Sequence, residues 1–284
     1  MPIESTAAGG APAVIGRFAP SPTGALHLGN LRTALIAWLS ARSQGGGFIV
    51  RMEDLDRATA DPVAAKRQLA DLAALGLDWD GEVVFQSTRF ARYDEALRVL
   101  AARGLVYECF CSRREVREQI DAAVTAPHGP PGAYPGTCRD LDDEARAAKR
   151  ATGRPAAHRL RTDGQFIAFA ERRGKRAEGA VDDFVLRRND GTPSYNVAVV
   201  VDDEEQGITE VVRGDDLQAS TPRQVLLQQL LGYRTPTYLH VPLLLGDDGE
   251  RLAKRHGAVT LDDLRADGVE IASIVAWMAR TLGL

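Results

Sequence analysis

The fold is decided by one stretch of the chain, Arg17-Phe18-Ala19-Pro20-Ser21-Pro22-Thr23-Gly24-Ala25-Leu26-His27-Leu28-Gly29-Asn30. An apolar segment at 13–15 precedes it. After it, apolar residues recur at helical spacing: Leu28, Leu31, Leu35, Trp38 and Leu39. The pattern predicts a strand, a tight loop rich in Pro, Ser, Thr and Gly, and then an amphipathic helix.

The start of that helix is suited to bind an anion, above all a phosphate, because its backbone N–H groups and the positive end of its dipole point outward. Gly29 allows close backbone approach, and His27 can donate a hydrogen bond to a phosphate oxygen. An ordinary strand–helix unit whose loop contains a histidine is the alternative, and His27 alone does not distinguish the two.

Length and composition indicate a globular protein with one large or two small domains, since the chain has 284 residues, 44% of them hydrophobic and 26% charged. It contains no apolar run of the roughly 18 residues that a membrane span needs. Residues 1–12 lack the basic start and apolar core of a signal peptide and are expected to form a flexible tail. A cytoplasmic location without a membrane partner is expected.

The charge distribution is uneven along the chain. The formal net charge of −4 argues against a generic, charge-driven nucleic-acid binder. Residues 107–188, however, contain 16 Lys and Arg against 13 Asp and Glu, so this middle region could face a polyanion. A solvated surface of mixed charge is an equally good interpretation of these counts.

Strands and helices alternate in the first third of the chain. A buried strand is predicted at 48–52, and helices are predicted at 61–75 and 91–103. This alternation predicts a doubly wound parallel sheet, whose ligands bind at the carboxyl ends of the strands. Arg17–Ser21 and Glu53 fall at such ends.

The alternation stops at Tyr107 and resumes near Ser194. We expect strands at 194–201, opened by Tyr195, at 208–212 and at 241–245, and helices at 221–231 and 261–284. The resulting domain boundaries are a tail at 1–12, a first half of the sheet domain at 13–106, an insertion at 107–188, a second half at 189–250, and a loop with C-terminal helices at 251–284.

All three cysteines lie in the insertion, where Cys109 and Cys111 are close in sequence and Cys138 follows a Gly- and Pro-rich loop. Three thiolates can hold a tetrahedral zinc ion if a fourth donor is present. His128 and Tyr134 are the candidates, and general zinc chemistry prefers the imidazole. Three unrelated reduced cysteines are the alternative.

The opening stretch resembles the His-Ile-Gly-His signature of class I aminoacyl-tRNA synthetases, with Asn30 in place of the last His, and residues 17–24 look like the glutamyl and glutaminyl branch. The resemblance runs from Arg17 to about Asp263. It implies a Rossmann-type α/β fold with a doubly wound parallel sheet, an inserted zinc-bearing α+β subdomain and a short C-terminal helical region.

The resemblance also implies a second signature loop. Residues Arg251-Leu252-Ala253-Lys254-Arg255 occupy the place of the family's Lys-Met-Ser-Lys-Ser loop. Lys254 matches the lysine that stabilises the pyrophosphate leaving group, whereas Arg251 and Arg255 depart from the pattern and retain or add charge. In the shortened members a Cys-x-Cys and a Tyr-x-x-x-Cys form the zinc site, which implies the ligands Cys109, Cys111, Tyr134 and Cys138.

The substrate-binding residues follow from the same resemblance. Those implied for glutamate are Arg17, Phe18, Ala19, Pro20, Ser21, Glu53, Tyr195 and Arg213, and those implied for ATP with its Mg²⁺ are His27, Gly29, Asn30 and Lys254. The residues themselves agree with an acidic substrate, because paired guanidinium groups bind carboxylates well. Taken singly, each arginine could equally be an ordinary surface residue.

Four features resemble a truncated class I family, the glutamyl-queuosine tRNA(Asp) synthetases: the short chain, Val199 where longer enzymes have asparagine, the Lys254-Arg255-His256-Gly257 run and the cysteine–tyrosine pattern. This family activates glutamate with ATP and esterifies queuosine in tRNA(Asp), so the implied partners are ATP, glutamate and that tRNA, bound by a monomer. A truncated glutamyl-tRNA synthetase and a non-catalytic paralogue that binds RNA or a protein are the alternatives.

Overall fold

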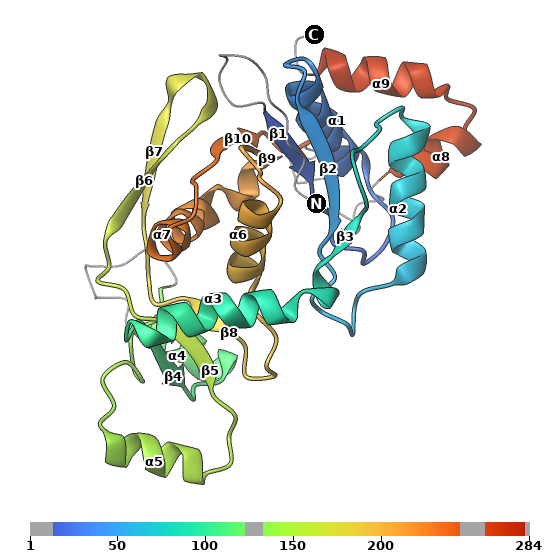
Figure 1. Ribbon diagram of the computed structural model, residues 1–284. Helices are drawn as coiled ribbons and strands as arrows, with labels where there is room; N and C mark the ends of the chain where they lie inside the picture. The colour runs from blue at the N-terminus through green and yellow to red at the C-terminus, as the bar shows by residue number, and fades with distance from the viewer. Residues whose placement is uncertain (1–13, 123–132, 245–258, 282–284) are drawn as a thin grey trace. The chain divides into compact units, whose positions relative to one another are not determined.

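A computed structural model of the chain describes residues 14–122, 133–244 and 259–281 (Figure 1). They form two compact units. Unit 1 contains the described residues at 14–88, 207–218, 236–244 and 259–281, and unit 2 contains those at 89–206 and 219–235. Within the described ranges, no helix has the length and apolar character needed to cross a bilayer.

Unit 1 is built on parallel strands. Strand β1 (Ile15–Phe18) pairs with β2 (Gly47–Met52), which pairs with β3 (Val84–Phe85), while β9 (Glu210–Gly214) pairs with β10 (Thr237–Val241). Thr209 joins the two groups, since its N–H donates to the Ile15 carbonyl at 3.0 Å and its hydroxyl accepts from the Ile15 N–H at 2.9 Å. The predicted parallel α/β sheet is confirmed.

The strand arrangement creates a topological switch point between β1 and β9. From β1 the chain passes through helix α1 (Leu28–Arg42) to β2 on one side, whereas β9 is followed by β10 on the other. Ligands of open α/β sheets bind at such a point, outside the carboxyl ends of the strands. Arg17 and Arg213 both lie at these ends.

The core of unit 1 is large and apolar. Nineteen buried residues form one cluster, to which β1, β2, α1, α2 (Pro62–Ala74), α8 (Leu261–Ala266) and α9 (Ile271–Arg280) contribute. Phe48, Val50 and Met52, which share one face of β2, are fully buried. The predicted helix at 61–75 is α2, with Asp61 as its N-cap and Pro62 in its first turn.

Unit 2 combines antiparallel strands with helices. Strands β4 (Val106–Cys109), β5 (Ala157–Leu160) and β8 (Val185–Arg187) form one sheet, and β6 (Phe166–Ala170) and β7 (Arg176–Ala180) form a separate hairpin. Its helices are α3 (Phe90–Ala102), α4 (Arg113–Ala122), α5 (Asp143–Ala151), α6 (Tyr195–Glu205) and α7 (Thr221–Leu231). Of the short 3₁₀ turns, η2 (Arg172–Gly174) lies in unit 2, η1 (Gln86–Thr88) lies in unit 1, and η3 (Asp215–Ser220) runs from unit 1 into unit 2. The domain boundaries set out from the sequence remain a prediction.

The strand predicted at 194–201 is wrong, because these residues begin helix α6. Val197, Val199, Val200 and Val201 are all buried, so packing around the whole helix outweighs the strand preference of β-branched residues. Arg89 and Tyr93 of unit 2 fix the helix by donating to the Asp202 carboxylate at 2.7 and 2.9 Å. Tyr195 therefore opens a helix and not a strand.

The last strand is also displaced from its predicted position. Strand β10 is Thr237–Val241 and not 241–245. Its register with β9 runs from Thr237 opposite Glu210 to Val241 opposite Gly214. Pro242 follows at once and has no N–H group with which to continue the ladder.

Candidate active site

His27 is the N-cap of α1 rather than an isolated loop residue. Its Nδ1 accepts from the Asn30 N–H at 3.3 Å, and the Asn30 side chain accepts from the His27 N–H at 3.2 Å. A neutral imidazole that accepts at Nδ1 carries its proton on Nε2, so it can donate from that atom. The reciprocal cap therefore fixes the tautomer that suits a phosphate oxygen.

Gly29 is required by the position of the His27 ring. A Cβ on Gly29 would lie 2.9 Å from His27 Cε1 and 3.0 Å from Nδ1, closer than real side chains approach. Any larger residue would push the imidazole away from its cap. The absence of a side chain at Gly29 therefore leaves room for the His27 ring. This is in addition to the close approach of a ligand to the backbone that the sequence predicts.

A later segment of the chain lies beside this turn. His27 forms a β-bridge with Thr260, and the Leu28 N–H donates to the Val259 carbonyl at 3.1 Å. Residues 259–260 directly follow the predicted second signature loop. That loop itself, Arg251, Leu252, Ala253, Lys254 and Arg255, lies outside the described residues.

The loop between β1 and α1 is held through its main-chain carbonyl groups. Gln68 of α2 donates to the carbonyls of Ser21 and Gly24 at 3.1 and 2.8 Å. The Pro22 carbonyl accepts from Asp61 N–H at 2.8 Å. Phe18 is 8% exposed and its side chain packs in the core cluster, while Ala19 and Thr23 are less buried.

Two buried arginines lie at the switch point. Arg17 and Arg213 are each 4% exposed, and an Arg17 Nη1 donates to the carbonyl of Val212, the neighbour of Arg213, at 3.2 Å. A buried guanidinium keeps its charge and is costly to desolvate without an anion nearby. The pair is well placed to bind a carboxylate.

Arg213 is oriented by strand β10. Its Nε donates to Nε2 of His240 at 3.2 Å, and its guanidinium carbon lies 5.2 Å from the centre of the Tyr238 ring. The Tyr238 and His240 rings are parallel, with their centres 6.0 Å apart. One hydrogen bond and one cation–π contact therefore limit the rotamers open to Arg213.

Glu53 follows the carboxyl end of β2. Its N–H donates to the Pro20 carbonyl at 2.9 Å, so the residue is tied to the signature turn. Its carboxylate lies 3.5 Å from Nη2 of the fully buried Arg51. Tyr195 belongs to unit 2, and its relation to these residues of unit 1 remains a prediction.

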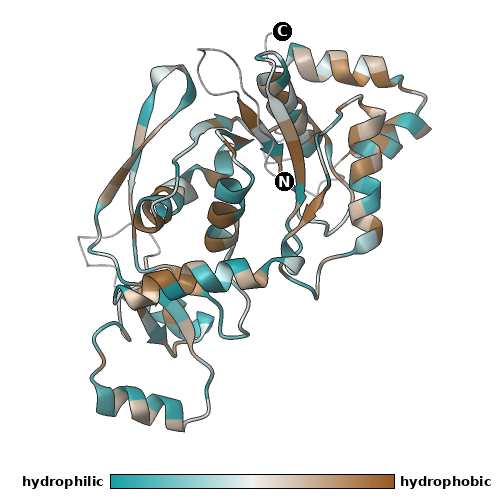
Figure 2. Ribbon diagram, viewed as in Figure 1, coloured by the Kyte–Doolittle hydropathy of each residue, from teal (hydrophilic) through white to brown (hydrophobic). Residues whose placement is uncertain are grey.

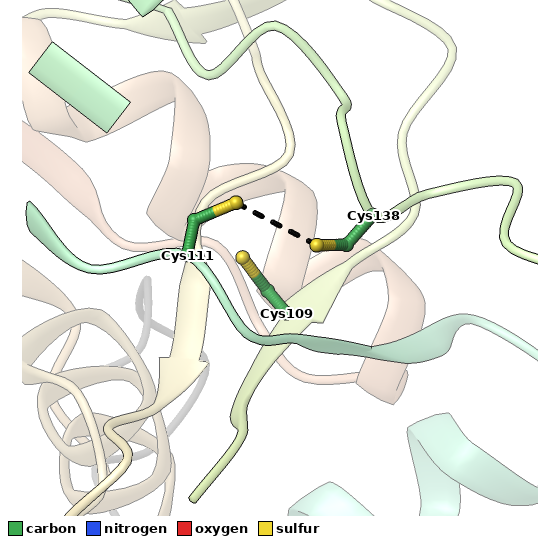
Figure 3. A group of neighbouring side chains, drawn as sticks. All are labelled: Cys109, Cys111 and Cys138. Carbon is green, nitrogen blue, oxygen red and sulfur yellow. Dashed lines mark hydrogen bonds between the residues drawn. The ribbon is translucent and has the colours of Figure 1, made fainter. Parts of the chain in front are cut away.

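The three cysteines of unit 2 converge (Figure 3). The sulfur atoms of Cys109, Cys111 and Cys138 all lie within 4.8 Å of one another, and those of Cys111 and Cys138 are 3.6 Å apart. The Tyr134 hydroxyl oxygen is 3.4 Å from Cys109 Sγ and 3.7 Å from Cys111 Sγ, and it accepts from the Cys138 N–H at 2.9 Å. Four tetrahedral zinc ligands at about 2.3 Å have similar mutual spacings, so the donor set fits this ion.

The pKa values of Cys109, Cys111 and Tyr134 depend on burial and on neighbouring groups. Burial raises the pKa of the Cys111 thiol to about 11 and also raises the pKa of Tyr134. Burial opposes ionisation of Cys109 too, but the Tyr134 hydroxyl and the Arg159 guanidinium lower its pKa below the ordinary value. A divalent ion would reverse the first two effects and release protons as it bound.

Arg159 belongs to this cluster, although the sequence analysis did not single it out as functional. Its guanidinium carbon lies 3.7 Å above the Tyr134 ring, and its Nη1 donates to the Asp183 carbonyl at 2.7 Å. Three thiolates with one zinc ion carry one net negative charge, which this cation can offset. His128, the other candidate ligand, lies outside the described residues.

Sequence reasoning also missed Gln68 and His240. A correct placement of β10 would have found His240, because the parallel register puts it opposite Arg213. Gln68 gives no local signal, since its role as a donor to two loop carbonyls depends on how α2 packs.

Comparison with known proteins identifies the family to which the chain belongs. Residues 13–282 match the family described as tRNA synthetases class I (E and Q), catalytic domain. The chain is 56% identical to a Glutamyl-Q tRNA(Asp) synthetase of Nocardia farcinica, covering 99% of this chain and 88% of the relative. It is 50% identical to another of that name from Symbiobacterium thermophilum, covering 95% and 86%.

A solved structure shows the same fold. The glutamate tRNA ligase of Elizabethkingia meningosepticum, crystallised with its amino acid, superposes with a TM-score of 0.73 at 30% identity. The match covers 86% of this chain and 52% of the ligase, so this chain spans about half the length of that enzyme.

Proposed function

The chain belongs to the class I tRNA synthetases for glutamate and glutamine and, among them, to the glutamyl-Q tRNA(Asp) synthetases, and from this membership we propose that it activates L-glutamate with ATP and transfers it to queuosine in tRNA(Asp). It is an enzyme of the ligase type. One observation carries the amino-acid assignment, namely the two buried guanidinium groups at the switch point.

Arg17 and Arg213 bind the carboxylate groups of glutamate in this proposal. Glu53 pairs with its ammonium group, and the backbone from Phe18 to Ser21 lines the same edge of the sheet. An apolar or neutral side chain in place of the carboxylate would lose the charge-assisted hydrogen bonds to these guanidinium groups, each of which contributes about 1.5 to 3 kcal/mol. Tyr195 supplies a hydroxyl that orients the substrate.

The signature turn binds ATP. The phosphates lie at the positive end of the α1 dipole, beside the Gly29 N–H, and His27 donates from Nε2. Asn30 acts through the cap that holds the His27 ring, because its own N–H donates to His27 Nδ1. Lys254 neutralises charge on the pyrophosphate as it leaves. Mg²⁺ enters with ATP and shields the charges of the phosphate oxygens.

The first reaction joins a glutamate carboxylate oxygen to the α-phosphorus of ATP and breaks the bond to pyrophosphate. In the second, a hydroxyl of queuosine attacks the carbonyl carbon of the adenylate, and AMP leaves as the ester forms. The hydroxyl proton passes to a phosphate oxygen of the departing AMP, since no described residue of the proposed set stands out as a general base. Positioning and charge stabilisation supply most of the rate.

We also propose that Cys109, Cys111, Tyr134 and Cys138 hold a structural zinc ion. The support is the convergence of the three sulfur atoms around the Tyr134 hydroxyl and the small apolar core around them. When bound, zinc cross-links β4 to the loop that contains Tyr134 and Cys138. Tyr134→Phe keeps the ring under Arg159 and removes the donor oxygen.

Metal content and affinity test the choice of ligand. If Tyr134 is the fourth ligand, Tyr134→Phe lowers zinc affinity by at least about 10- to 100-fold, because loss of a group that only hydrogen-bonds to a ligand already costs that much. His128→Gln then leaves the affinity unchanged. The reverse pattern would transfer the role to His128.

Acid-labile incorporation of radioactive glutamate tests the whole function. Purified protein is incubated with ATP, glutamate and tRNA from wild-type cells or from cells that cannot make queuosine. We expect incorporation only into the modified tRNA. An ester on queuosine is distinguished from an ester on the 3′-terminal ribose by periodate oxidation of that ribose, with the modified base protected beforehand. Charging of unmodified tRNA would indicate a truncated glutamyl-tRNA synthetase, and absence of glutamate-dependent pyrophosphate exchange would indicate a non-catalytic paralogue.

A further inference from the structure

The β6–β7 hairpin of unit 2 has features that neither proposed site uses (Figure 1). Strands β6 and β7 pair over five residues each, from Phe166 opposite Ala180 to Ala170 opposite Arg176. The loop at 171–175 closes with a hydrogen bond from the Glu171 N–H to the Lys175 carbonyl at 2.8 Å. Gly174 has a φ of 73°, which favours glycine and makes the turn tight.

The inner face of the hairpin is anchored to α7. Ile167 and Phe169 are 8% and 5% exposed. A Cβ on Gly179 would lie 2.7 Å from Cγ of Pro222, the second residue of α7. Because the strand is pressed against this helix, the hairpin projects its loop from a fixed base.

The outer face exposes an aromatic ring. Phe166 is 69% exposed, the largest value among described phenylalanine and tryptophan residues, and only the small Ala180 lies opposite it. Alternation places Ala168, Ala170, Glu178 and Arg176 on the same face. A single exposed apolar residue is ordinary on a protein surface, so the ring is informative only together with the charge on the same hairpin.

The loop end of the hairpin is strongly basic. Residues 171–176 read Glu-Arg-Arg-Gly-Lys-Arg, a net charge of +3 in a chain whose total is −4. Lys175 and Arg176 are exposed and Arg172 is half-buried. The hairpin's other acidic residue is Glu178, so positive charge dominates (Figure 2 shows the loop in hydrophilic and β6 in hydrophobic colours).

We propose that the outer face and loop of this element, called here the basic hairpin (165–181), bind the tRNA substrate. Lys175, Arg176 and Arg172 contact backbone phosphates, and the Phe166 ring stacks on an unpaired base. Phe166 lies four residues along the strand pair from Arg176, a separation of about 13 Å. Exposed aromatic rings beside cations are the usual features of surfaces that bind single-stranded nucleic acid. This inference rests on the proposed function, because it assumes that the substrate is RNA.

The test removes two charges and leaves the fold alone. Lys175→Gln/Arg176→Gln is compared with the matched pair Lys149→Gln/Arg150→Gln, an exposed Lys-Arg dipeptide on α5 of the same unit. We expect the hairpin variant to raise KM for modified tRNA about tenfold. The dependence of log binding constant on log salt should become shallower by about 1.4 to 1.8, the value for two lost phosphate contacts. The α5 variant should match the wild type.

A second pair of variants isolates stacking. Phe166→Leu keeps an apolar side chain and removes the aromatic face, whereas Phe166→Trp enlarges it. We expect Leu to weaken tRNA binding about tenfold and Trp to preserve it or strengthen it. Equal binding by both variants would overturn the stacking contact, and a loss of thermal stability in either would indicate a structural role.

Adenylate formation separates this inference from the proposed function, because that step does not use tRNA. Unchanged glutamate-dependent pyrophosphate exchange with weakened transfer supports the basic hairpin. Unchanged exchange with unchanged tRNA binding overturns it and leaves the proposed function standing. If the wild type shows no exchange, direct binding of labelled tRNA still tests the hairpin, and a preference of the wild type for anionic vesicles over tRNA would also overturn it.

Discussion

The signature turn of unit 1 and the cysteine cluster of unit 2 are both built on loops, but different forces hold them. The turn follows a strand of a core with nineteen buried apolar residues. Its main-chain carbonyls accept hydrogen bonds from the Gln68 side chain and from the N–H groups of Asp61 and Glu53. The cysteine cluster has five buried residues, among them Cys109, Cys138 and Tyr134 themselves. Its side chains are both the ligands and most of the core.

Because of this difference, a substitution at the turn and a substitution at the cysteine cluster should change different properties of the protein. In unit 1 a polar residue can be replaced and the loop stays, because main-chain atoms determine its path. In the cluster, removal of one side chain removes a large part of what orders the loop, since so small an apolar group buries little surface. Substitutions should therefore change catalysis in unit 1 and stability in unit 2.

Arg213→Met should produce the largest effect. The long apolar side chain fills the space beside Tyr238 and His240 but leaves the substrate carboxylate without its cation. Loss of one partner of a buried ion pair costs about 4 kcal/mol, so glutamate-dependent pyrophosphate exchange should fall about a thousandfold. Thermal unfolding should change little.

The control for this variant is Arg67→Met, because Arg67 forms an exposed pair with Asp262 at 2.7 Å in the same unit. Surface pairs contribute about 0 to 1 kcal/mol, so exchange should remain within about twofold of the wild type. Comparable losses in both variants would mean that Arg213 does not bind substrate.

Cys138→Ser should reverse the pattern. We expect zinc content to fall from one ion per chain to nearly none, and the unfolding temperature to drop by roughly 10 °C, as for a loss of about 3 kcal/mol in a domain of this size. Exchange should stay within about threefold of the wild type. The measurements are elemental analysis and calorimetry of the same samples. A zinc-free wild type, or an unchanged unfolding temperature, would rule out a structural metal.

The contrast also explains what could be predicted from the sequence. The turn was predictable because its residues are contiguous and its helix has a clear apolar period, and the parallel sheet followed from the alternation of elements. The cysteine cluster could be suggested from spacing, but the distance between Cys111 and Cys138 depends on how β4 meets a loop 27 residues away.

Helix α6 and strand β10 were mispredicted for different reasons. In α6, valines that favour strands lie in a buried helix, and local patterns cannot report such packing. Strand β10 was placed on the apolar run at 241–245, although Thr237 and Tyr238 favour a strand and Pro242 ends it. These elements contain two residues of the proposed site: Tyr195 opens α6, and His240, which accepts from Arg213, lies in β10.

His27→Asn tests whether the cap and the chemistry at the turn are separable. Asparagine is a good N-cap, so α1 should keep its start and the unfolding temperature should stay the same. The Nε2 donor is lost, and exchange should fall about a hundredfold, as when one donor to a developing charge is removed. His27→Ala should lose about 1 kcal/mol of stability in addition. Full exchange activity in His27→Asn would reduce His27 to a capping residue.

His158 should give the smallest effect, and it lies in unit 2, at a cavity whose lining includes Asp94 and Arg187. Burial lowers the pKa of His158, and the nearby Arg187 lowers it further, against a smaller opposite effect of Glu108. The folded chain therefore binds fewer protons at this site than the unfolded chain, whose imidazole has a pKa of about 6.5. The free energy of unfolding should fall as the pH drops through 6.5 towards the folded value.

His158→Gln removes this dependence because glutamine does not titrate. Between pH 7 and 5.5 we expect the wild type to lose up to about 1 kcal/mol more than the variant, a bound reduced by the partial exposure of the ring. Denaturant unfolding of zinc-saturated samples measures the difference, and the two proteins should keep a constant difference above pH 7.5, where His158 is neutral in both states. If the free energies of unfolding of the two proteins instead stay parallel down to pH 5.5, the acid sensitivity of unit 2 is assigned to its thiolates. The difference between the two regions would then depend on the metal site alone.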